Sequence, residues 1–130
     1  MKRRGIINAP LSGHLARLGH TDLVVVADAG LPVPPHVPVV DLALVFGKPT
    51  FVDVLDALLD EIVVEHAWIS ADADTRPPAS WVDSRLEQPA ERIPHPDLKA
   101  MVGDARLVVR TGEATASATV VLRCGVPFPV

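Results

Sequence analysis

The sequence contains no tyrosine, a single cysteine and few aromatic residues of any kind. With Cys124 as the only cysteine, no disulfide can form within the chain. Nothing therefore requires an oxidising compartment, and we expect a cytoplasmic protein. No stretch approaches the roughly 20 consecutive apolar residues that a membrane helix needs, so no membrane partner is expected. The formal net charge of −4 provides no general attraction to nucleic acid.

Sequence motifs for bound cofactors are also missing. The cysteine and the histidines do not have the spacing of a zinc site. Gly103 and Gly112 lie in no phosphate-binding pattern, so no nucleotide is implied. The sequence therefore predicts a protein that works without a metal and without a cofactor.

Strand and helix patterns alternate along the 130 residues, a length that supports one domain, residues 1–130, with one core. Strands are predicted at residues 23–27, 39–44, 63–70, 105–110 and 118–123. Helices are predicted from Pro10 or Ser12 to residue 18, and at residues 50–62, 79–86 and 95–102. The alternation favours an α/β fold, a three-layer α/β/α sandwich with a mainly parallel central sheet. The proline-rich residues 31–38 are predicted to form an ordered loop, and residues 88–94 to be irregular.

The strand at residues 23–27 is the best-defined element, and it has one titratable residue on each side. Its apolar run suits a strand buried on both faces, with His20 before it and Asp28 after it. A histidine and an aspartate held by a rigid element can form a catalytic pair. On spacing alone, however, His20 could simply end a helix, and Asp28 could be an ordinary turn residue before Gly30. The pair could meet only if the chain turns between residues 19 and 22, or through a neighbouring subunit.

Several blocks resemble the D-ribose pyranase family of sugar mutarotases. The blocks are Gly-His-Thr-Asp at residues 19–22 and Val-Val-Ala-Asp-Ala-Gly-Leu-Pro-Val-Pro at residues 25–34. The resemblance begins at residues 1–8, returns at residues 41–44, 47–51 and 54–55, and ends at residues 110–113 and 125–128. Because these blocks follow one another over nearly the whole chain, the resemblance is specific. The Asp-Ala-Gly-Leu-Pro form is closer to ribose pyranases than to the related fucose mutarotases.

The resemblance implies a catalytic mechanism and three site residues. His20 matches the acid/base histidine of the family, Asp28 matches its sugar-binding carboxylate, and His95 matches a second ligand-binding histidine. The implied reaction interconverts the pyranose and furanose forms, and the anomers, of a monosaccharide such as D-ribose by acid/base ring opening. No metal, nucleotide or redox cofactor is needed for this chemistry. The resemblance also implies a homo-oligomer of stacked pentamers, a decamer, with sites between neighbouring subunits.

One segment departs from the family pattern. Where the family usually has a tyrosine and an asparagine, this chain has Ser117 and Thr119. Both can bind a sugar by hydrogen bonds, but neither offers an aromatic face or the reach of a phenol. Three readings therefore stay open: a mutarotase, a monosaccharide-binding relative that has lost turnover, and a structural ring subunit.

Overall fold

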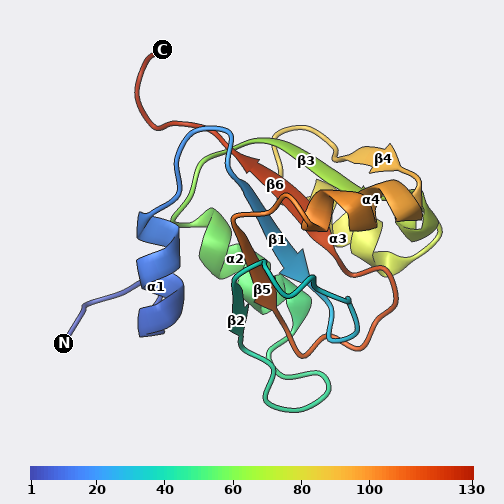
Figure 1. The fold of residues 1–130 in the computed structure, drawn as a ribbon, viewed down its shortest axis with the longest axis horizontal. Coiled ribbons are helices and arrows are strands. Elements are labelled where there is room, and N and C mark those ends of the chain that lie inside the picture. Colours follow the sequence, from blue (N-terminus) through green and yellow to red (C-terminus); the bar gives the residue numbers. More distant parts are fainter.

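A six-stranded sheet forms the centre of the computed structural model, which describes all residues from 1 to 130 (Figure 1). Its strands lie in the order β2-β5-β1-β6-β3-β4. Their bounds are β1 Leu23–Ala27, β2 Val39–Asp41, β3 Val64–Ser70, β4 Glu91–Ile93, β5 Leu107–Arg110 and β6 Val120–Cys124. β1 pairs in parallel with β5 on one side and antiparallel with β6 on the other. Because only β6 runs against the rest, the sheet is mixed and mainly parallel, as the sequence predicted.

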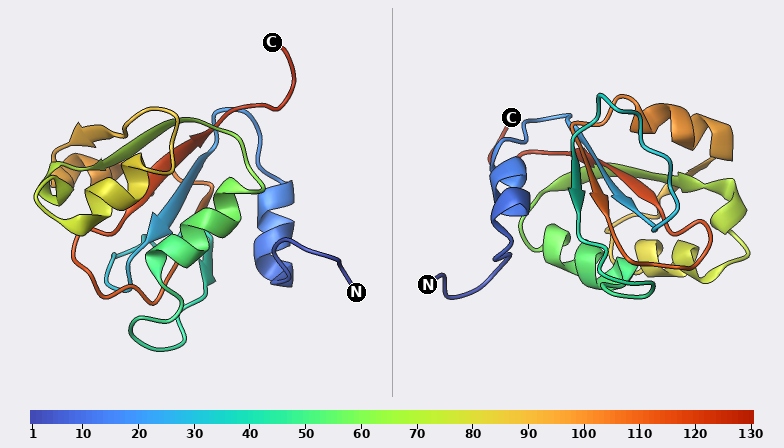
Figure 2. Two further views of the ribbon diagram at one scale, coloured as in Figure 1. Left: turned by 180° about the vertical axis from the view of Figure 1, so that it is seen from behind. Right: turned by 60° about the horizontal axis from the view of Figure 1, so that its bottom comes forward.

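Helices cover both faces of the sheet and complete the three layers (Figure 2). The four α-helices are α1 Ala9–Ala16, α2 Phe51–Leu59, α3 Pro77–Asp83 and α4 His95–Val102, and a 3-10 turn, η1, spans Ala71–Ala73. α2 and α3 lie on one face and α4 lies on the other. The expected single-domain α/β/α sandwich is therefore confirmed. No helix is long and apolar enough to cross a membrane.

Two hydrophobic clusters lie on opposite faces of the sheet because the side chains of each strand alternate between the faces. In β1, Val24 and Val26 point into the larger cluster, whereas Val25 points into the smaller one. The larger cluster contains the apolar stripe of α2, whose buried residues are Phe51, Val54, Leu55 and Leu58. Burial on both faces explains the continuous apolar run of β1, and it fixes where the strand begins and ends.

Two predicted segments differ most from the structure, and smaller differences in bounds occur elsewhere, as in the helix predicted at residues 79–86, which spans Pro77–Asp83. The second strand ends at Asp41 instead of residue 44, because the Asp41 carboxylate accepts hydrogen bonds from Arg110 and from the backbone N–H of Ala43. The chain then leaves the sheet in an exposed loop. The segment at 88–94 is not irregular throughout, since Glu91–Ile93 forms the edge strand β4 beside β3. This strand is only three residues long, too short for an alternating pattern to reveal it.

An ion pair between Arg92 and Asp83 links β4 to α3. Arg92 Nη2 donates to Asp83 Oδ2 at 2.7 Å, and Arg92 Nη1 donates to Asp83 Oδ1 at 3.0 Å. The Arg92 hydrogen bonds hold the pKa of Asp83 below its ordinary value. A carboxylate whose pKa is lower in the folded state than in the unfolded state stabilises the fold at pH values above its unfolded-state pKa. This stability is lost as the pH falls through the folded-state pKa.

We expect Asp83→Asn to lower the free energy of unfolding by about 1 kcal/mol at pH 7, because asparagine keeps one oxygen acceptor but loses the charge that pairs with Arg92. The difference from wild type should shrink as the pH falls through the folded-state pKa of Asp83, which lies below its ordinary value. Urea unfolding at pH 7 and at the lowest pH where the fold persists measures both values. An equal loss at the two pH values would mean that the charge of Asp83 contributes nothing.

Candidate active site

Asp28 is held at the point where β1 ends. Its Oδ1 accepts a hydrogen bond from the backbone N–H of Gly30 at 2.9 Å, and its Oδ2 accepts one from the Thr119 hydroxyl at 3.1 Å. The backbone N–H of Asp28 donates to the same hydroxyl oxygen at 3.3 Å. The carboxylate is half-buried and fixed from two sides, so it presents its remaining lone pairs in a defined direction.

Thr119 reaches Asp28 because of the antiparallel course of β6. The first residue of β6, Val120, pairs with Val26 of β1 and with Ile69 of β3. Thr119 therefore enters the sheet between the carboxyl ends of β1 and β3, where it is 4% exposed. The structure thus brings together Asp28 and Thr119, two residues that lie 91 positions apart in the sequence.

His95 lies at the same end of the sheet. It is the first residue of α4, directly after β4, and its Nδ1 lies 3.3 Å from the hydroxyl oxygen of Ser70. Ser70 ends β3 and is 1% exposed. Because β3 is the strand next to β6, the imidazole of His95 and the hydroxyl of Thr119 occupy neighbouring strand ends.

Ser117 lies in the loop that precedes β6, and it has a left-handed backbone conformation with φ of 64°. A serine rarely adopts this conformation, which therefore marks a constrained turn. The Ser117 hydroxyl accepts a hydrogen bond from Arg76 Nη1 at 3.3 Å. Arg76 comes from the segment between η1 and α3 and forms no ion pair with a carboxylate, so it adds an unpaired positive charge to this edge.

The loop after β5 supports the end of β1. The Thr111 hydroxyl donates to the carbonyl oxygen of Ala27 at 2.8 Å, and the backbone N–H of Ala29 donates to the carbonyl oxygen of Glu113 at 2.9 Å. The Glu113 side chain accepts a hydrogen bond from the backbone N–H of Phe51 at the start of α2. Gly112 packs so tightly that a Cβ atom there would lie 2.3 Å from the carbonyl oxygen of Lys48. Through these contacts, the Arg-Thr-Gly-Glu block at residues 110–113 holds the chain around Asp28 in place.

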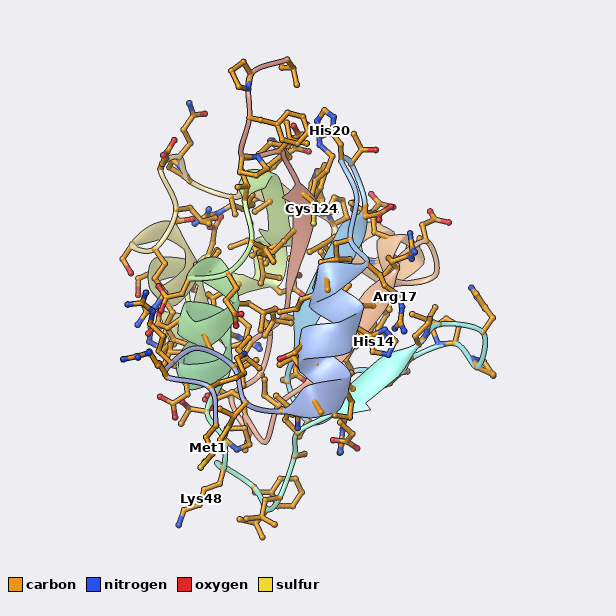
Figure 3. The ribbon with its side chains drawn as sticks, turned by 90° about the vertical axis from the view of Figure 1, so that its left-hand side faces the viewer. Met1, His14, Arg17, His20, Lys48 and Cys124 are labelled. Atoms are coloured by element: carbon orange, nitrogen blue, oxygen red, sulfur yellow. The ribbon has the colours of Figure 1, made fainter.

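His20 lies at the other end of β1, far from this cluster. Figure 3 shows it at the opposite end of the molecule from Lys48, whose loop packs against Gly112. Its Nε2 lies 3.0 Å from Glu65 Oε2, and its side chain is 45% exposed. Thr21, which follows it, has φ of 71°, so the turn before β1 is constrained as well.

The structure therefore brings together four of the five predicted site residues at the carboxyl end of the sheet, namely Asp28, His95, Ser117 and Thr119. It does not bring His20 to them within one chain, because β1 separates His20 from Asp28 by roughly 16 Å of strand. Sequence reasoning missed the polar partners Ser70, Arg76 and Glu65. Each lies far from its partner in sequence, and no local pattern indicates such a contact.

A carboxylate, an imidazole and several hydroxyl groups at the open end of a sheet form a hydrogen-bonding surface that suits a polyhydroxylated ligand. No group of three or more His, Cys, Asp or Glu side chains could hold a metal ion. With this surface at one end of its sheet, the chain is a small, single-domain α/β protein of the three-layer class.

The chain belongs to the RbsD / FucU transport protein family, whose model matches residues 1–127. It is 51% identical to a protein of Cutibacterium acnes named D-ribose pyranase, over 98% of this chain and 100% of the relative. It is 53% identical to D-ribose pyranase 1 of Rubrobacter xylanophilus, with the same coverage. The structure of Bacillus subtilis RbsD complexed with D-ribose matches with a TM-score of 0.93 and 41% identity, over 98% of this chain and 100% of that chain. The fucose mutarotase of Streptococcus pneumoniae, at 19% identity and a TM-score of 0.80, shares the fold.

Proposed function

We propose that the protein is a sugar mutarotase that interconverts the pyranose and furanose forms, and the anomers, of D-ribose or a similar monosaccharide. The observation that carries the proposal is the cluster of Asp28, Thr119 and His95 at one end of the sheet. About half of the residues are identical, over the full chain, to proteins named D-ribose pyranase, which makes the chain an enzyme of that isomerase type.

The proposed chemistry opens and recloses the sugar ring. A base removes the proton from the anomeric hydroxyl while an acid protonates the ring oxygen, the bond between the anomeric carbon and the ring oxygen breaks, and the aldehyde forms. Closure by either available hydroxyl, on either face of the aldehyde, returns both protons and gives another ring form. A histidine can donate or accept a proton near neutral pH, so His20 is assigned the acid/base role. Asp28 and His95 are assigned to the sugar hydroxyls.

His20 and Asp28 can act on one sugar only if two copies of the chain share a site. Because the two residues lie at opposite ends of β1, the contact joins the His20 end of one copy to the Asp28 end of the next. Such a head-to-tail contact uses two different surfaces and closes into a ring when the rotation permits, which supports the proposed pentamer or decamer.

Apolar side chains are exposed at both of these ends. Beyond β6, Phe128 is 63% exposed, in a tail without charge. At the other end, Leu44 is 79% exposed and Phe46 is 83% exposed, beside a cavity of about 370 Å³ that Ala29 also lines. Large exposed apolar side chains are typical of surfaces that another molecule covers. We propose that the tail of one copy covers the loop at residues 43–46 of the next.

We expect Asp28→Asn to weaken ribose binding and turnover about 10- to 100-fold, because charge-assisted hydrogen bonds to sugar hydroxyls become neutral ones. Calorimetric titration with ribose and NMR exchange rates measure the two effects. Asp41→Asn is a suitable control, since Asp41 also lies at the carboxyl end of a strand and its carboxylate bonds Arg110. Normal affinity combined with a large fall in melting temperature would assign Asp28 to turn formation only.

Ser117 and Thr119 should shape the sugar preference. Without a tyrosine the pocket should be wider and less aromatic than that of family members that have one, so we expect a weaker affinity for ribose or a preference for another sugar. Ser117→Tyr combined with Thr119→Asn should then raise ribose turnover several-fold. The measurement is the exchange rate of a panel of sugars with both proteins. A wild-type preference for ribose that the double substitution reduces would show that another residue fills this place.

A second candidate function is sugar binding without turnover, and the Ser117 and Thr119 side chains favour it. Saturation-transfer NMR on ribose and other monosaccharides separates the two functions. Acceleration of exchange between ring forms is expected for the mutarotase. Line broadening without acceleration would identify a binding protein, and neither effect with any sugar would contradict both.

A further inference from the structure

We propose that Glu65 is a positioning residue for His20, and that Arg123 in turn positions Glu65. The inference deepens the proposed function, because it rests on the acid/base role of His20. Glu65 lies on β3 and Arg123 on β6, so a rigid pair of neighbouring strands would orient a side chain that comes from the loop before β1.

The Glu65 carboxylate is divided between its two partners. Its Oε2 lies 3.0 Å from Nε2 of His20, and its Oε1 accepts a hydrogen bond from Nε of Arg123 at 2.8 Å. The Arg123 guanidinium lies 5.5 Å from the centre of the Trp68 ring, a cation–π distance that limits its motion. The chain of contacts therefore runs from a stacked arginine through a carboxylate to the imidazole.

This arrangement leaves one ring nitrogen of His20 for the sugar. Nδ1 has no hydrogen-bond partner in the chain, whereas Nε2 is occupied by Glu65. A carboxylate on one nitrogen of an imidazole fixes the ring orientation and favours the protonated ring. Glu65 would thus hold Nδ1 in one direction while it stabilises the imidazolium that forms when the histidine takes up a proton.

The charges around His20 support the same assignment. The hydrogen bond to His20 and the one from Arg123 keep the pKa of Glu65 below its ordinary value. Asp22 accepts a hydrogen bond from the backbone N–H of Gly19, and Arg106 pairs with Asp22. Two further carboxylates lie nearby, since Glu61 lines one cavity with Gly19 and Glu87 lines another with Glu65. Cys124 is neutral at pH 7, since burial first, and then Asp22 and Glu65, raise its pKa to about 11. Glu65 is the carboxylate that contacts the imidazole directly.

The chain contains a matched pair for comparison. Across the neighbouring strands β3 and β4, His66 Nε2 lies 3.2 Å from Glu91 Oε1, and the His66 ring contacts Trp68 edge-on at 4.5 Å between ring centres. This second histidine–glutamate pair has a similar distance and is also partly exposed, but it has no assigned role in the proposed site. Glu91→Gln is therefore a control for the removal of one such charge.

The test compares Glu65→Gln, Glu65→Asp and Glu91→Gln with the wild-type protein. We expect Glu65→Gln to slow ribose exchange about 2- to 5-fold, the size expected of an exposed ion pair, with the ribose dissociation constant unchanged. Glu65→Asp keeps the charge and should keep most of the wild-type rate, and Glu91→Gln should match wild type in rate.

Nitrogen NMR of the His20 ring tests the contact without any sugar. The Nε2 shift should change in Glu65→Gln and stay unchanged in Glu91→Gln. If wild type accelerates no sugar, the proposed function fails, whereas this shift still reports whether Glu65 holds the ring. A Glu65→Gln protein with the wild-type rate and Nε2 shift would overturn the inference, and so would equal effects of Glu65→Gln and Glu91→Gln.

Discussion

His20→Ala is expected to slow the exchange between ribose ring forms about 10²- to 10⁴-fold, the usual contribution of a general acid/base residue. The loss should appear in turnover and much less in binding, because the sugar hydroxyls are assigned to Asp28 and His95 at the other end of the chain. The fold should be unaffected, since His20 is exposed and its ring forms a hydrogen bond only with Glu65. Saturation-transfer NMR measures the exchange rate, and thermal unfolding checks the fold.

His14→Ala provides the control for this result. His14 lies on α1, forms no side-chain hydrogen bond in the chain and is not assigned to the site (Figure 3). Its replacement should leave the exchange rate within two-fold of wild type. A His20→Ala protein that retains the full rate would remove the acid/base role from His20 and the positioning role from Glu65 with it.

Deletion of residues 127–130 is expected to break the assembly and to abolish activity with it. The deleted tail is uncharged and exposed in the single chain, and Phe128 is the aromatic anchor proposed to cover the 43–46 loop of the next copy. Loss of the contact would separate His20 of one copy from Asp28 of the next. Light scattering should give a mass several times 13.9 kDa for wild type and close to 13.9 kDa for the truncated chain.

Removal of Val130 alone is the matched control, because this residue is fully exposed at the end of the tail. It should leave both mass and activity unchanged. If the wild-type protein has the mass of a single chain, the proposal of shared sites is wrong. If the truncated protein stays assembled but is inactive, the tail acts in the site and not in assembly.

The sequence predicted the elements whose apolar pattern is long and regular. β1 and α2 were found at nearly their observed positions because each buries a repeated set of apolar residues. The single domain, the three layers and the mainly parallel sheet followed from the alternation of strands and helices. The short edge strand β4 was missed because its three residues are held by pairing with β3 and by the Arg92 ion pairs, neither of which leaves a periodic signal.

The candidate site could be predicted only in part. Periodicity placed Asp28 at the end of a buried strand, and resemblance identified the other residues. No local pattern could indicate that Thr119 would fix the Asp28 carboxylate, because the antiparallel insertion of β6 between β1 and β3 creates that contact. The pairs between Glu65 and His20 and between Arg76 and Ser117 could not be predicted either, because only tertiary packing brings their residues together.

Co-assembly of two impaired variants tests the shared site most directly. Consider a ring built from equal amounts of His20→Ala and Asp28→Asn chains. A site is intact where an Asp28→Asn chain supplies the unchanged His20 and a neighbouring His20→Ala chain supplies the unchanged Asp28. Random head-to-tail assembly makes about a quarter of the sites intact. Co-expressed chains should therefore recover about a quarter of the wild-type ribose exchange rate, far above either variant alone. A co-assembled protein that is no more active than the better of its two parents would contradict the sharing of His20 and Asp28 between copies.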